Sequence, residues 1–322
     1  MNDTLSEVLK AVRLKGAVFF DVSCSEPWVA EAPSARAVAP TIMPDAEHVM
    51  EYHVITSGNC WATVVGHDIK PVRLTAGDVV AFPQGDAHVL SSAPGMRADL
   101  DLSEFPDARS QLPVLFNLDG GGEERAHVVC GFLGCDARPF NPLLESLPPI
   151  LHVRSNEQSD WMQQFTRFAL LEANEKRMGG GGILSKLGEL MFVELVRRYV
   201  ESLPEESRGW LGGLRDRHTG RALHLIHTQP RRDWTLDSLA KEAGLSRSSF
   251  TERFTGYVGV PPIQYLQKWR LQMAASRLIE GGTIADIAAD IGDESEAAFS
   301  RAFKRVIGAS PADWRNSRTV AR

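Results

Sequence analysis

The sequence lacks the features of a membrane protein and of a disulfide-stabilised protein. Its 322 residues contain no run apolar enough to span a bilayer, and residues 1–4 include an acidic residue and no apolar stretch, which predicts no secretory leader. The only cysteines are Cys24, Cys60, Cys130 and Cys135. None forms a CxxC pair, so free thiols in a reducing compartment are expected. These absences predict a cytoplasmic protein without a membrane partner.

An excess of positive charge is also missing from the chain as a whole. The formal net charge is −6, which argues against a nucleic-acid-binding protein because phosphate contacts need clustered Lys and Arg. The total hides an asymmetry. Residues 1–213 carry 18 Lys and Arg against 29 Asp and Glu, whereas residues 214–322 carry 17 against 12. This division predicts a basic nucleic-acid-binding segment that follows an acidic region.

The region from residue 17 to residue 153 has the pattern of an all-β domain. Short β-branched and aromatic runs such as AVFFDV, CWATVV, DVVAF and HVVCGFLG alternate with turn residues. Many short strands with frequent turns are typical of a sandwich or barrel. Before them, residues 4–13 have the apolar spacing of a short amphipathic helix.

Helical periodicity replaces the β pattern after residue 154. Ser155 and Gln158 have the spacing of a capping box. The apolar face of the first expected helix carries Trp161, Phe165, Phe168 and Leu171. That helix should end before the glycines at 179–182, and a second is expected over about 183–202. This hairpin is too apolar for one contact to bury, so either both faces pack on the β domain or one face mediates dimerisation.

The basic segment contains a weak internal duplication. The run LAKEAG at 239–244 is echoed by IAADIG at 287–292. The residues Phe250, Phe254, Gly259 and Pro262 recur at the same spacing as Phe299, Phe303, Gly308 and Pro311. Each copy predicts a short helix, a glycine turn and a second helix with two buried Phe, which is the helix-turn-helix plan. Two copies, joined by a long helix at about 261–279, indicate DNA binding much more strongly than one copy would.

These residues resemble the C-terminal DNA-binding domain of the AraC/XylS family of bacterial transcription regulators. The segment IADIAADIGDESEAAFSRAFKRVIGASPADWR matches the family's second motif, except that Asp293 stands where the family usually has an aromatic residue. The resemblance implies two recognition helices in successive major grooves on one DNA face, roughly 34 Å apart.

Burial of the two Phe pairs defines the outward faces of these recognition helices. The outward residues are Arg247, Ser248, Thr251 and Glu252 on the first helix, and Glu296, Ala297, Ser300 and Arg301 on the second, with Lys304 and Arg305 nearer the DNA backbone. Arg301 is the best candidate for a base contact, because bidentate Arg to guanine is the commonest specific pairing. Four arginines are expected to contact phosphates instead: Arg231, Arg232, Arg247 and Arg270. The alternative for each polar residue is a solvated helix face.

The acidic β domain carries a motif of the cupin superfamily, a small β-barrel. The residues Gly77, Pro83, Gly85 and His88 fit the second cupin motif, with Ser92 in place of its terminal Asn. The first motif is degraded. Glu51 and Gly58 have the right spacing, but residues 45–47 read Asp-Ala-Glu instead of His-x-His. His53 lies two residues after Glu51 and therefore points to the same side of the strand.

Together with the C-terminal match, residues 17–153 resemble the cupin-type sensor domain of one AraC-family subgroup. In metal-using cupins the barrel interior holds His and carboxylate ligands. The candidate ligands in this chain are Glu51, His53, His88 and Cys130. This mixed set suits zinc or a similar divalent ion. The alternative is a set of ordinary hydrogen-bonded strand residues.

The sequence therefore predicts an α+β multidomain protein. The expected parts are a cupin-like sensor barrel at 1–153, a helical hairpin at 154–203, a linker at 204–213 and an all-α double helix-turn-helix domain at 214–322. The predicted function is a sequence-specific transcription regulator. It is expected to be a homodimer that binds promoter DNA and responds to a small molecule or metal. RNA polymerase is a further expected partner if the regulator is an activator, and the sequence leaves activation and repression open. One alternative is a metal-dependent cupin enzyme, such as a dioxygenase or isomerase, fused to a DNA-binding tail, which the incomplete metal triad disfavours. Another is a barrel that serves only as a dimerisation scaffold.

Overall fold

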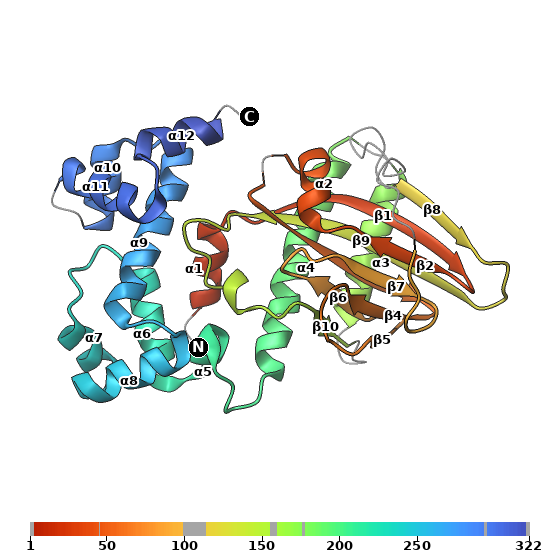
Figure 1. Ribbon diagram of the computed structural model, residues 1–322, viewed down its shortest axis with the longest axis horizontal. Coiled ribbons are helices and arrows are strands. Elements are labelled where there is room, and N and C mark those ends of the chain that lie inside the picture. The colour runs from red at the N-terminus through yellow and green to blue at the C-terminus, as the bar shows by residue number, and fades with distance from the viewer. Residues whose placement is uncertain are drawn as a thin grey trace. The chain divides into compact units, whose positions relative to one another are not determined.

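The computed structural model describes residues 3–44, 46–98, 114–154, 160–175, 178–292 and 295–319, which form two compact units (Figure 1). The barrel unit comprises residues 14–135 and 147–202, and the helical unit comprises residues 1–13, 136–146 and 203–322. The predicted α+β class is confirmed. Among the described helices, none combines the length and apolar character needed to cross a bilayer.

The barrel unit consists of two facing sheets. The strands are β1 (Lys15–Ser25), β2 (Val29–Ala32), β3 (His48–Ser57), β4 (Asn59–Val64), β5 (Val72–Thr75), β6 (Val79–Phe82), β7 (His88–Ser91), β8 (Val114–Asp119), β9 (Arg125–Cys135) and β10 (Leu151–Val153). The larger sheet has the order β10-β6-β3-β9-β1-β8, and the smaller has the order β2-β7-β4-β5. A short helix that the sequence pattern did not predict, α2 (Ala35–Ile42), packs on β3.

Strand β3 shows how the larger sheet is buried on both faces. Its alternate residues Val49 and Ile55 belong to the apolar core between the sheets. Tyr52 points the other way, against Gly131 of β9 and towards Gly188 of the hairpin. Because both glycines lack a Cβ, the tyrosine ring fits between the sheet and the helix. Glu51 and His53 share the inward side of β3 with the core residues.

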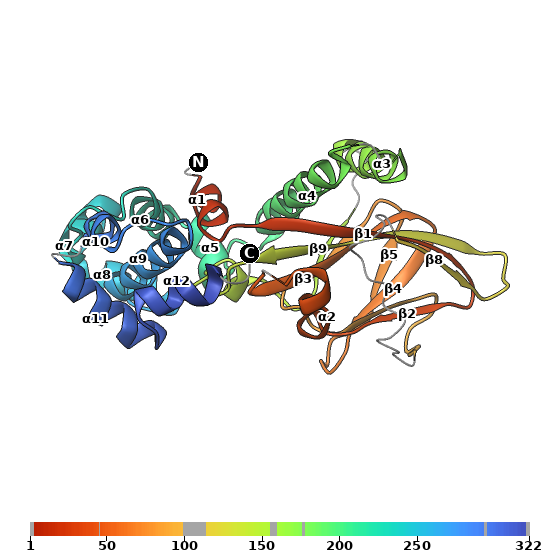
Figure 2. The same ribbon diagram turned by 90° about the horizontal axis from the view of Figure 1, so that it is seen from above.

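The expected hairpin consists of α3 (Asp160–Glu175) and α4 (Gly180–Ser202), and α4 lies along β1 (Figure 2). The second helix begins at Gly180, earlier than predicted, directly after Gly179, which has a φ of +84°. One face, with Leu187, Met191 and Leu195, is buried, but Phe168 and Leu190 are 46% and 56% exposed. The expectation that both faces pack on the barrel is therefore wrong. The capping-box residues 155–159 and the side chain of residue 161 lie outside the described residues.

The helical unit is built around one long central helix. Its helices are α1 (Thr4–Ala11), α5 (Gly209–Arg215), α6 (Arg217–Thr228), α7 (Leu236–Ala243), α8 (Arg247–Val258), α9 (Pro262–Ile279), α10 (Ile284–Ile291), α11 (Glu296–Ile307) and α12 (Pro311–Thr319), with a 3-10 turn, η2, at Leu144–Ser146. Helix α9 joins the pair α7–α8 to the pair α10–α11.

Two segments that the sequence assigned to the sensor pack instead in the helical unit. The hydroxyl of Ser276 on α9 donates to the carbonyl of Ala11 (2.8 Å), and the amide of Phe140 donates to the buried Gln272 side chain (3.0 Å). Arg13 pairs with Asp136 at 2.7 Å, which ties the two segments together. Residues 1–13 and 136–146 thus satisfy buried polar groups of α9. The predicted continuous sensor domain at 1–153 missed this, because both segments adjoin barrel strands in the sequence.

The predicted linker at 204–213 is wrong for residues 209–213, which belong to α5. Trp210 is buried and donates its indole N–H to the hydroxyl of Tyr265 (2.7 Å). Gly212 is a packing residue and not a flexible one, since a Cβ there would lie 2.1 Å from the carbonyl oxygen of Ser207. The glycine-rich composition suggested flexibility where the chain is closely packed.

Candidate functional site

The helix pairs α7–α8 and α10–α11 have the same backbone plan. The turn between the helices passes through a glycine with positive φ, +74° at Gly244 and +79° at Gly292. The second helix is capped by Ser246 in one pair and by Ser295 in the other, and each side chain accepts a hydrogen bond from the N–H three residues on. The duplication of sequence is therefore a duplication of structure.

Two aromatic pairs fix which face of each second helix turns outward. Phe250 and Phe254 are buried with ring centroids 5.7 Å apart, and Phe299 and Phe303 are buried at 5.4 Å. All four rings lie on the core side of their helices, one turn apart. The opposite faces of the two helices point away from these cores, as the sequence predicted.

The outward face of α8 has little free positive charge. Arg247 lies 3.5 Å from Asp237, and Arg253 forms an ion pair with Asp216. Thr251 donates its hydroxyl to the carbonyl of Arg247 (2.9 Å) and is partly buried. The predicted outward residues of this helix do share one surface hollow, lined by Ser246, Arg247, Ser248, Thr251 and Glu252.

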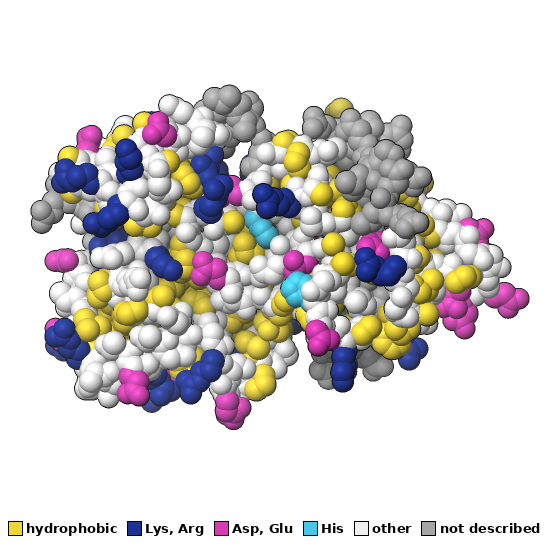
Figure 3. Space-filling model, in the orientation of Figure 1, with side chains coloured by type: hydrophobic (Ala, Val, Ile, Leu, Met, Phe, Trp, Pro, Cys, Tyr) yellow, Lys and Arg dark blue, Asp and Glu magenta, His cyan; other side chains and the backbone are white. Residues whose placement is uncertain are grey.

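The outward face of α11 carries unpaired cations. Arg301, Lys304 and Arg305 are exposed, and none forms an ion pair with another residue in the described part of the chain. Glu296 and Ala297 are also exposed and Ser300 is partly buried. Lys and Arg side chains are spread over the visible surface of the helical unit (Figure 3). The departure from the motif at residue 293 lies outside the described residues.

All four arginines expected at phosphates have partners within the protein, and that of Arg247 is Asp237. Arg231 forms an ion pair with Asp290 of α10. Arg270 donates to the carbonyls of Pro230 (2.8 Å) and of Arg232 (3.0 Å). The guanidinium of Arg232 itself lies 4.0 Å from the centre of the Trp234 ring. The last three side chains hold the α6–α7 connection against α9 and α10.

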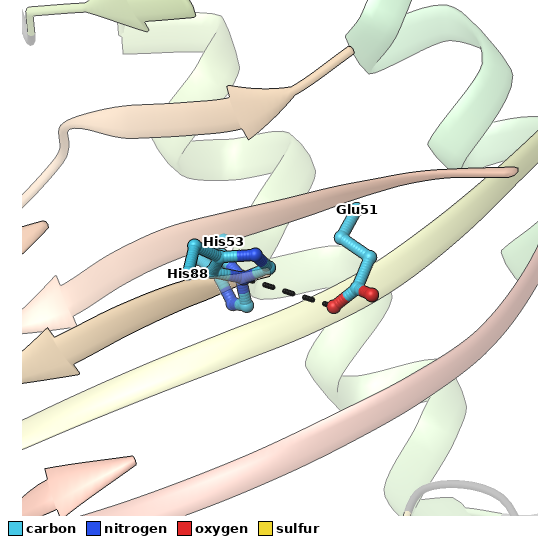
Figure 4. Close-up of side chains that lie close together, drawn as sticks. All are labelled: Glu51, His53 and His88. Carbon is cyan, nitrogen blue, oxygen red and sulfur yellow. Dashed lines mark hydrogen bonds and ion pairs between the residues drawn. The ribbon is translucent and has the colours of Figure 1, made fainter. Parts of the chain in front are cut away.

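Three buried polar side chains converge inside the barrel (Figure 4). Glu51 and His53 come from β3, and His88 begins β7 in the opposite sheet. The Nε2 atoms of His53 and His88 are 2.7 Å apart, and His88 Nε2 is 3.7 Å from Glu51 Oε2. One ligand atom from each residue lies within 4.8 Å of the other two. This is the only such group of three or more His, Cys, Asp or Glu found in the described ranges.

The surroundings orient these side chains towards one another. The Nδ1 of His88 is 3.0 Å from the carbonyl of Asp86, so Nδ1–H donates there and Nε2 keeps its lone pair. The ring of Phe82 stacks on His88 with centroids 3.6 Å apart. Glu51 Oε1 and His53 Nδ1 are buried without a hydrogen-bond partner among the described residues. Such orphaned atoms are rare in native proteins and point to a missing partner.

Burial sets the protonation of this group. It raises the pKa of Glu51 to about 8 and lowers the pKa of His88 to about 4. Burial and the neighbouring His88 lower the pKa of His53 well below its usual value. Burial therefore favours the uncharged form of all three side chains when no cation is bound.

The donor set fits a zinc-like cation. Tetrahedral zinc with bonds of about 2.0–2.1 Å holds its ligand atoms roughly 3.3 Å apart, which lies between the two distances seen here. Cys130 lies opposite His53 in the β3–β9 ladder and lines the same cavity, but it is not part of the three-residue group. Burial raises the pKa of this thiol well above its usual value. The structure thus brings together three of the four predicted ligands.

The three residues form part of the wall of a cavity of about 260 Å³. The remaining wall comes from both sheets and is mainly apolar: Phe20, Val22, Trp28, Ala30, Glu31, Ala32, Leu90, Ala98, Phe116, Leu118, Val128, Cys130 and Phe132. Sequence reasoning missed Trp28 and the aromatic wall, because a cavity-facing aromatic residue has the same sequence pattern as a core residue.

The comparisons with known proteins agree with this architecture. A cupin family model matches residues 3–201, and a helix-turn-helix domain model matches residues 239–317. The chain is 34% identical over 278 residues to an AraC-like transcription regulator of Streptomyces lividans, covering 86% of this chain and 90% of that protein. It is 30% identical to the HTH-type transcriptional regulator AlkR of Acinetobacter baylyi, covering 84% and 89%.

Among solved structures, one similar structure is the DNA-binding domain of AdpA in complex with a target DNA. The matched region covers 33% of this chain and 96% of the AdpA chain, at 28% identity and a TM-score of 0.30.

A cupin domain joined to paired helix-turn-helix motifs defines a DNA-binding transcription regulator, and the relatives are named as regulators. The chain belongs to the AraC-like family of transcription regulators. The alternative of a cupin enzyme is not favoured, because these relatives match the chain across both of its parts.

Proposed function

We propose that this regulator binds promoter DNA through α8 and α11 and that an effector in the barrel cavity controls it. One observation carries the proposal: the same chain has an exposed cationic recognition face and a cavity whose wall includes the converging buried side chains Glu51, His53 and His88. Control requires that the effector bind two states of the barrel with different affinity. The protein then acts as a regulator without catalysis, in the cytoplasm where promoter DNA lies. If it activates transcription, it also contacts RNA polymerase.

In this proposal α11 supplies most of the sequence reading. Arg301 forms the bidentate contact to a guanine, and Lys304 and Arg305 neutralise phosphates. The remaining groove contacts come from Arg247, Ser248, Thr251, Glu252, Glu296, Ala297 and Ser300. The ion pairs around α8 support a weaker contribution from that helix.

We further propose that Glu51, His53 and His88 hold one divalent cation of the zinc type, with Cys130 as a candidate fourth ligand. The support is the convergence of two imidazole nitrogens and a carboxylate with orphaned atoms in a buried place. A bound cation would supply positive charge in the cavity. The protein's own part is to orient His88 through Asp86 and to keep water away from the group.

Zinc titration of the metal-stripped full chain against a fluorescent chelator tests this proposal. We expect one zinc per chain, and we expect His88→Ala or His53→Ala to weaken binding by about 100-fold. His152→Ala on β10 is the matched control and should bind like the parent. Unchanged zinc affinity in His88→Ala would refute the site. Stoichiometric redox-active iron with substrate turnover would restore the enzyme alternative.

We also propose that the outer face of the α3–α4 hairpin mediates homodimerisation. The support is the set of exposed apolar side chains that this hairpin carries: Phe168, Leu171, Met178, Ile183 and Leu190. Sedimentation equilibrium of the full chain should show a dimer, and Leu190→Glu should shift it to monomer while Lys186→Ala does not. A Leu190→Glu variant that remains dimeric would exclude this face.

A further inference from the structure

The apolar core behind the second helix-turn-helix pair contains no residue of the first pair among those that the structure describes. Helix α9 runs from the α7–α8 pair to the α10–α11 pair (Figure 1). The residues of this core come from α9, α10, α11 and α12 alone. Apolar packing in this core therefore fixes the second pair on α9 but does not tie it to the first pair.

A polar connection joins the two pairs instead. The segment between α6 and α7, residues 229–235, leads into the first pair, and Asp290 lies on α10 of the second pair. Arg231 in this segment forms an ion pair with Asp290, and so does Arg277 of α9. The carboxylate of Asp290, only 16% exposed, thus receives two guanidinium groups, one from the segment before α7 and one from α9.

The backbone of the same segment is also held in place. Arg270 of α9 donates its Nε–H to the carbonyl of Pro230 (2.8 Å) and an Nη2–H to that of Arg232 (3.0 Å). The carbonyl oxygen of Arg231 and the guanidinium of Arg270 both lie against Gly292, where an added Cβ would be 3.4 Å from each. Gly292 is the positive-φ turn of the second pair. The segment before the first pair therefore contacts the turn within the second pair.

The geometry of DNA makes the relative placement of the two pairs important. Each base pair added between two sites on a duplex moves them apart by about 3.4 Å and turns one relative to the other by about 34°. A protein whose two reading helices are fixed relative to one another fits only one spacing without deforming itself or the DNA. We call the side chains that connect the two pairs the bracket: Arg231, Arg270, Arg277 and Asp290. Because it is a network of ion pairs and charge-assisted hydrogen bonds, it resists deformation better than an isolated surface ion pair does.

We infer that the bracket fixes the spacing between the base pairs read by α8 and those read by α11, with Asp290 as its central positioning residue. Asp290 acts through Arg231 and does not itself contact DNA. The inference rests on the proposed binding of both helices to one duplex, and it adds the reason why one spacing is preferred. The preferred target is then a duplex whose two subsites lie at a single separation.

Fluorescence anisotropy of the full chain on a series of spacings tests the inference. The full chain selects a duplex from a random library, and hydroxyl-radical footprinting locates the protected subsites. Two further duplexes have one base pair added or removed between the subsites. We expect the parent to bind these about tenfold more weakly than the selected duplex, and Asp290→Ala to bind them only about threefold more weakly. Because a ratio is measured for each protein, a uniform change of affinity caused by the altered charge cancels.

Further variants define the role of the carboxylate. Arg231→Ala removes the ion pair from the other side, so it should relax the spacing preference as Asp290→Ala does, and the double variant should relax it no further. Asp290→Glu retains a carboxylate and should keep most of the parent's preference. The matched control is Glu280→Ala at the end of α9, which changes the net charge equally. The Glu280 side chain is exposed and forms no ion pair with another residue in the described ranges, so this variant should keep the parent's preference.

An Asp290→Ala variant that keeps the parent's spacing preference would overturn the inference and leave the proposed function intact. An equal rise in affinity on all three duplexes, with a steeper salt dependence, would also overturn it, because Asp290 would then only mask the charges of Arg231 and Arg277. If Asp290→Ala fails to fold, Arg231→Ala decides alone, since that side chain is 65% exposed. A parent that protects a single subsite would refute the proposed use of both helices, and the inference with it.

Discussion

The two helix-turn-helix pairs share a scaffold but differ in their outward chemistry. Both have a glycine turn, a serine cap and a buried Phe pair, so burial and backbone geometry are the same. On α8, Arg247 and Arg253 are held by carboxylates, whereas Arg301 on α11 is exposed and forms no ion pair with another described residue. A duplicated fold therefore does not imply a duplicated role, and we assign most of the base reading to the second pair.

The two pairs also differ in what supports them. Behind the first pair, the hydroxyl of Tyr265 is 2.8 Å from Nε2 of the buried His227 and accepts from Trp210. Behind the second pair, the core is apolar and closes with the ring of Trp314 against Phe303. One half of the helical unit thus depends on a buried titratable network, and the other half depends on hydrophobic packing.

The largest expected effect comes from truncating the buried rings. Phe299→Ala and Phe250→Ala should each lower the free energy of unfolding by about 3–5 kcal/mol, because each leaves a cavity in its own core. Urea unfolding followed by tryptophan fluorescence measures this. Val306→Ala, on an α11 side chain that is 55% exposed, is the control and should change stability by less than about 0.5 kcal/mol. A loss below about 1 kcal/mol in Phe299→Ala would show that the second core is loosely packed.

Acid should destabilise the half of the helical unit that contains His227 more than the half with the apolar core. Burial and the nearby His224 lower the pKa of His227 to about 3, so the unfolded chain binds a proton below about pH 6.5 that the folded chain does not. Stability is therefore lost as pH falls from about 6.5 towards 3, by roughly 3 kcal/mol between pH 7 and pH 4.5.

The comparison of His227→Gln with the parent isolates this effect from the barrel histidines. The variant should be less stable at pH 7, because its contact with Tyr265 is altered, but its stability should fall less steeply in acid. Thr228→Ala, in the same helix, removes no titratable group, so it is the matched control and should keep the parent's slope. If His227→Gln and the parent lose stability equally in acid, protonation of His227 is not the cause of that loss.

The smallest effect concerns salt. Lys304→Ala or Arg305→Ala should reduce the slope of log affinity against log salt concentration by about one unit, because one phosphate contact is lost. Arg247→Ala should reduce it less, since Asp237 already occupies that guanidinium. Fluorescence anisotropy at several salt concentrations measures both slopes. If Arg247→Ala and Lys304→Ala reduce the salt slope equally, the outward faces of α8 and α11 do not differ in their phosphate contacts.

The sequence predicted the parts of the fold that depend on local pattern. The spacing of Phe250 and Phe254, repeated at Phe299 and Phe303, identified both second helices and their buried faces. The fit of His88 to a cupin motif, together with the position of His53 two residues after Glu51, predicted the group that the structure brings together. Each of these rests on a period or a spacing that a helix or strand converts directly into geometry.

The rest depends on contacts between residues far apart in the chain. Nothing in residues 1–13 or 136–146 shows that Ser276 and Gln272 will receive them, because a short segment can pack on either unit. The sequence could not predict the cavity either, since Trp28 and Phe116 have the pattern of core residues. The sequence predicted phosphate contacts for Arg231 and Arg270 but did not predict their partners within the protein. A basic residue in a sequence does not reveal which carboxylate or carbonyl lies nearby.

The central claim is that Arg301 of α11 reads a base, and one measurement tests it most directly. Binding of the full chain and of Arg301→Ala is measured by anisotropy against its specific duplex and a set of single-base variants, with Ser248→Ala as the counterpart on α8. We expect Arg301→Ala to lose about 1–3 kcal/mol on the specific site and to stop discriminating at one base pair, while Ser248→Ala loses less. If Arg301→Ala binds every duplex as the parent does, α11 does not read the sequence through this residue.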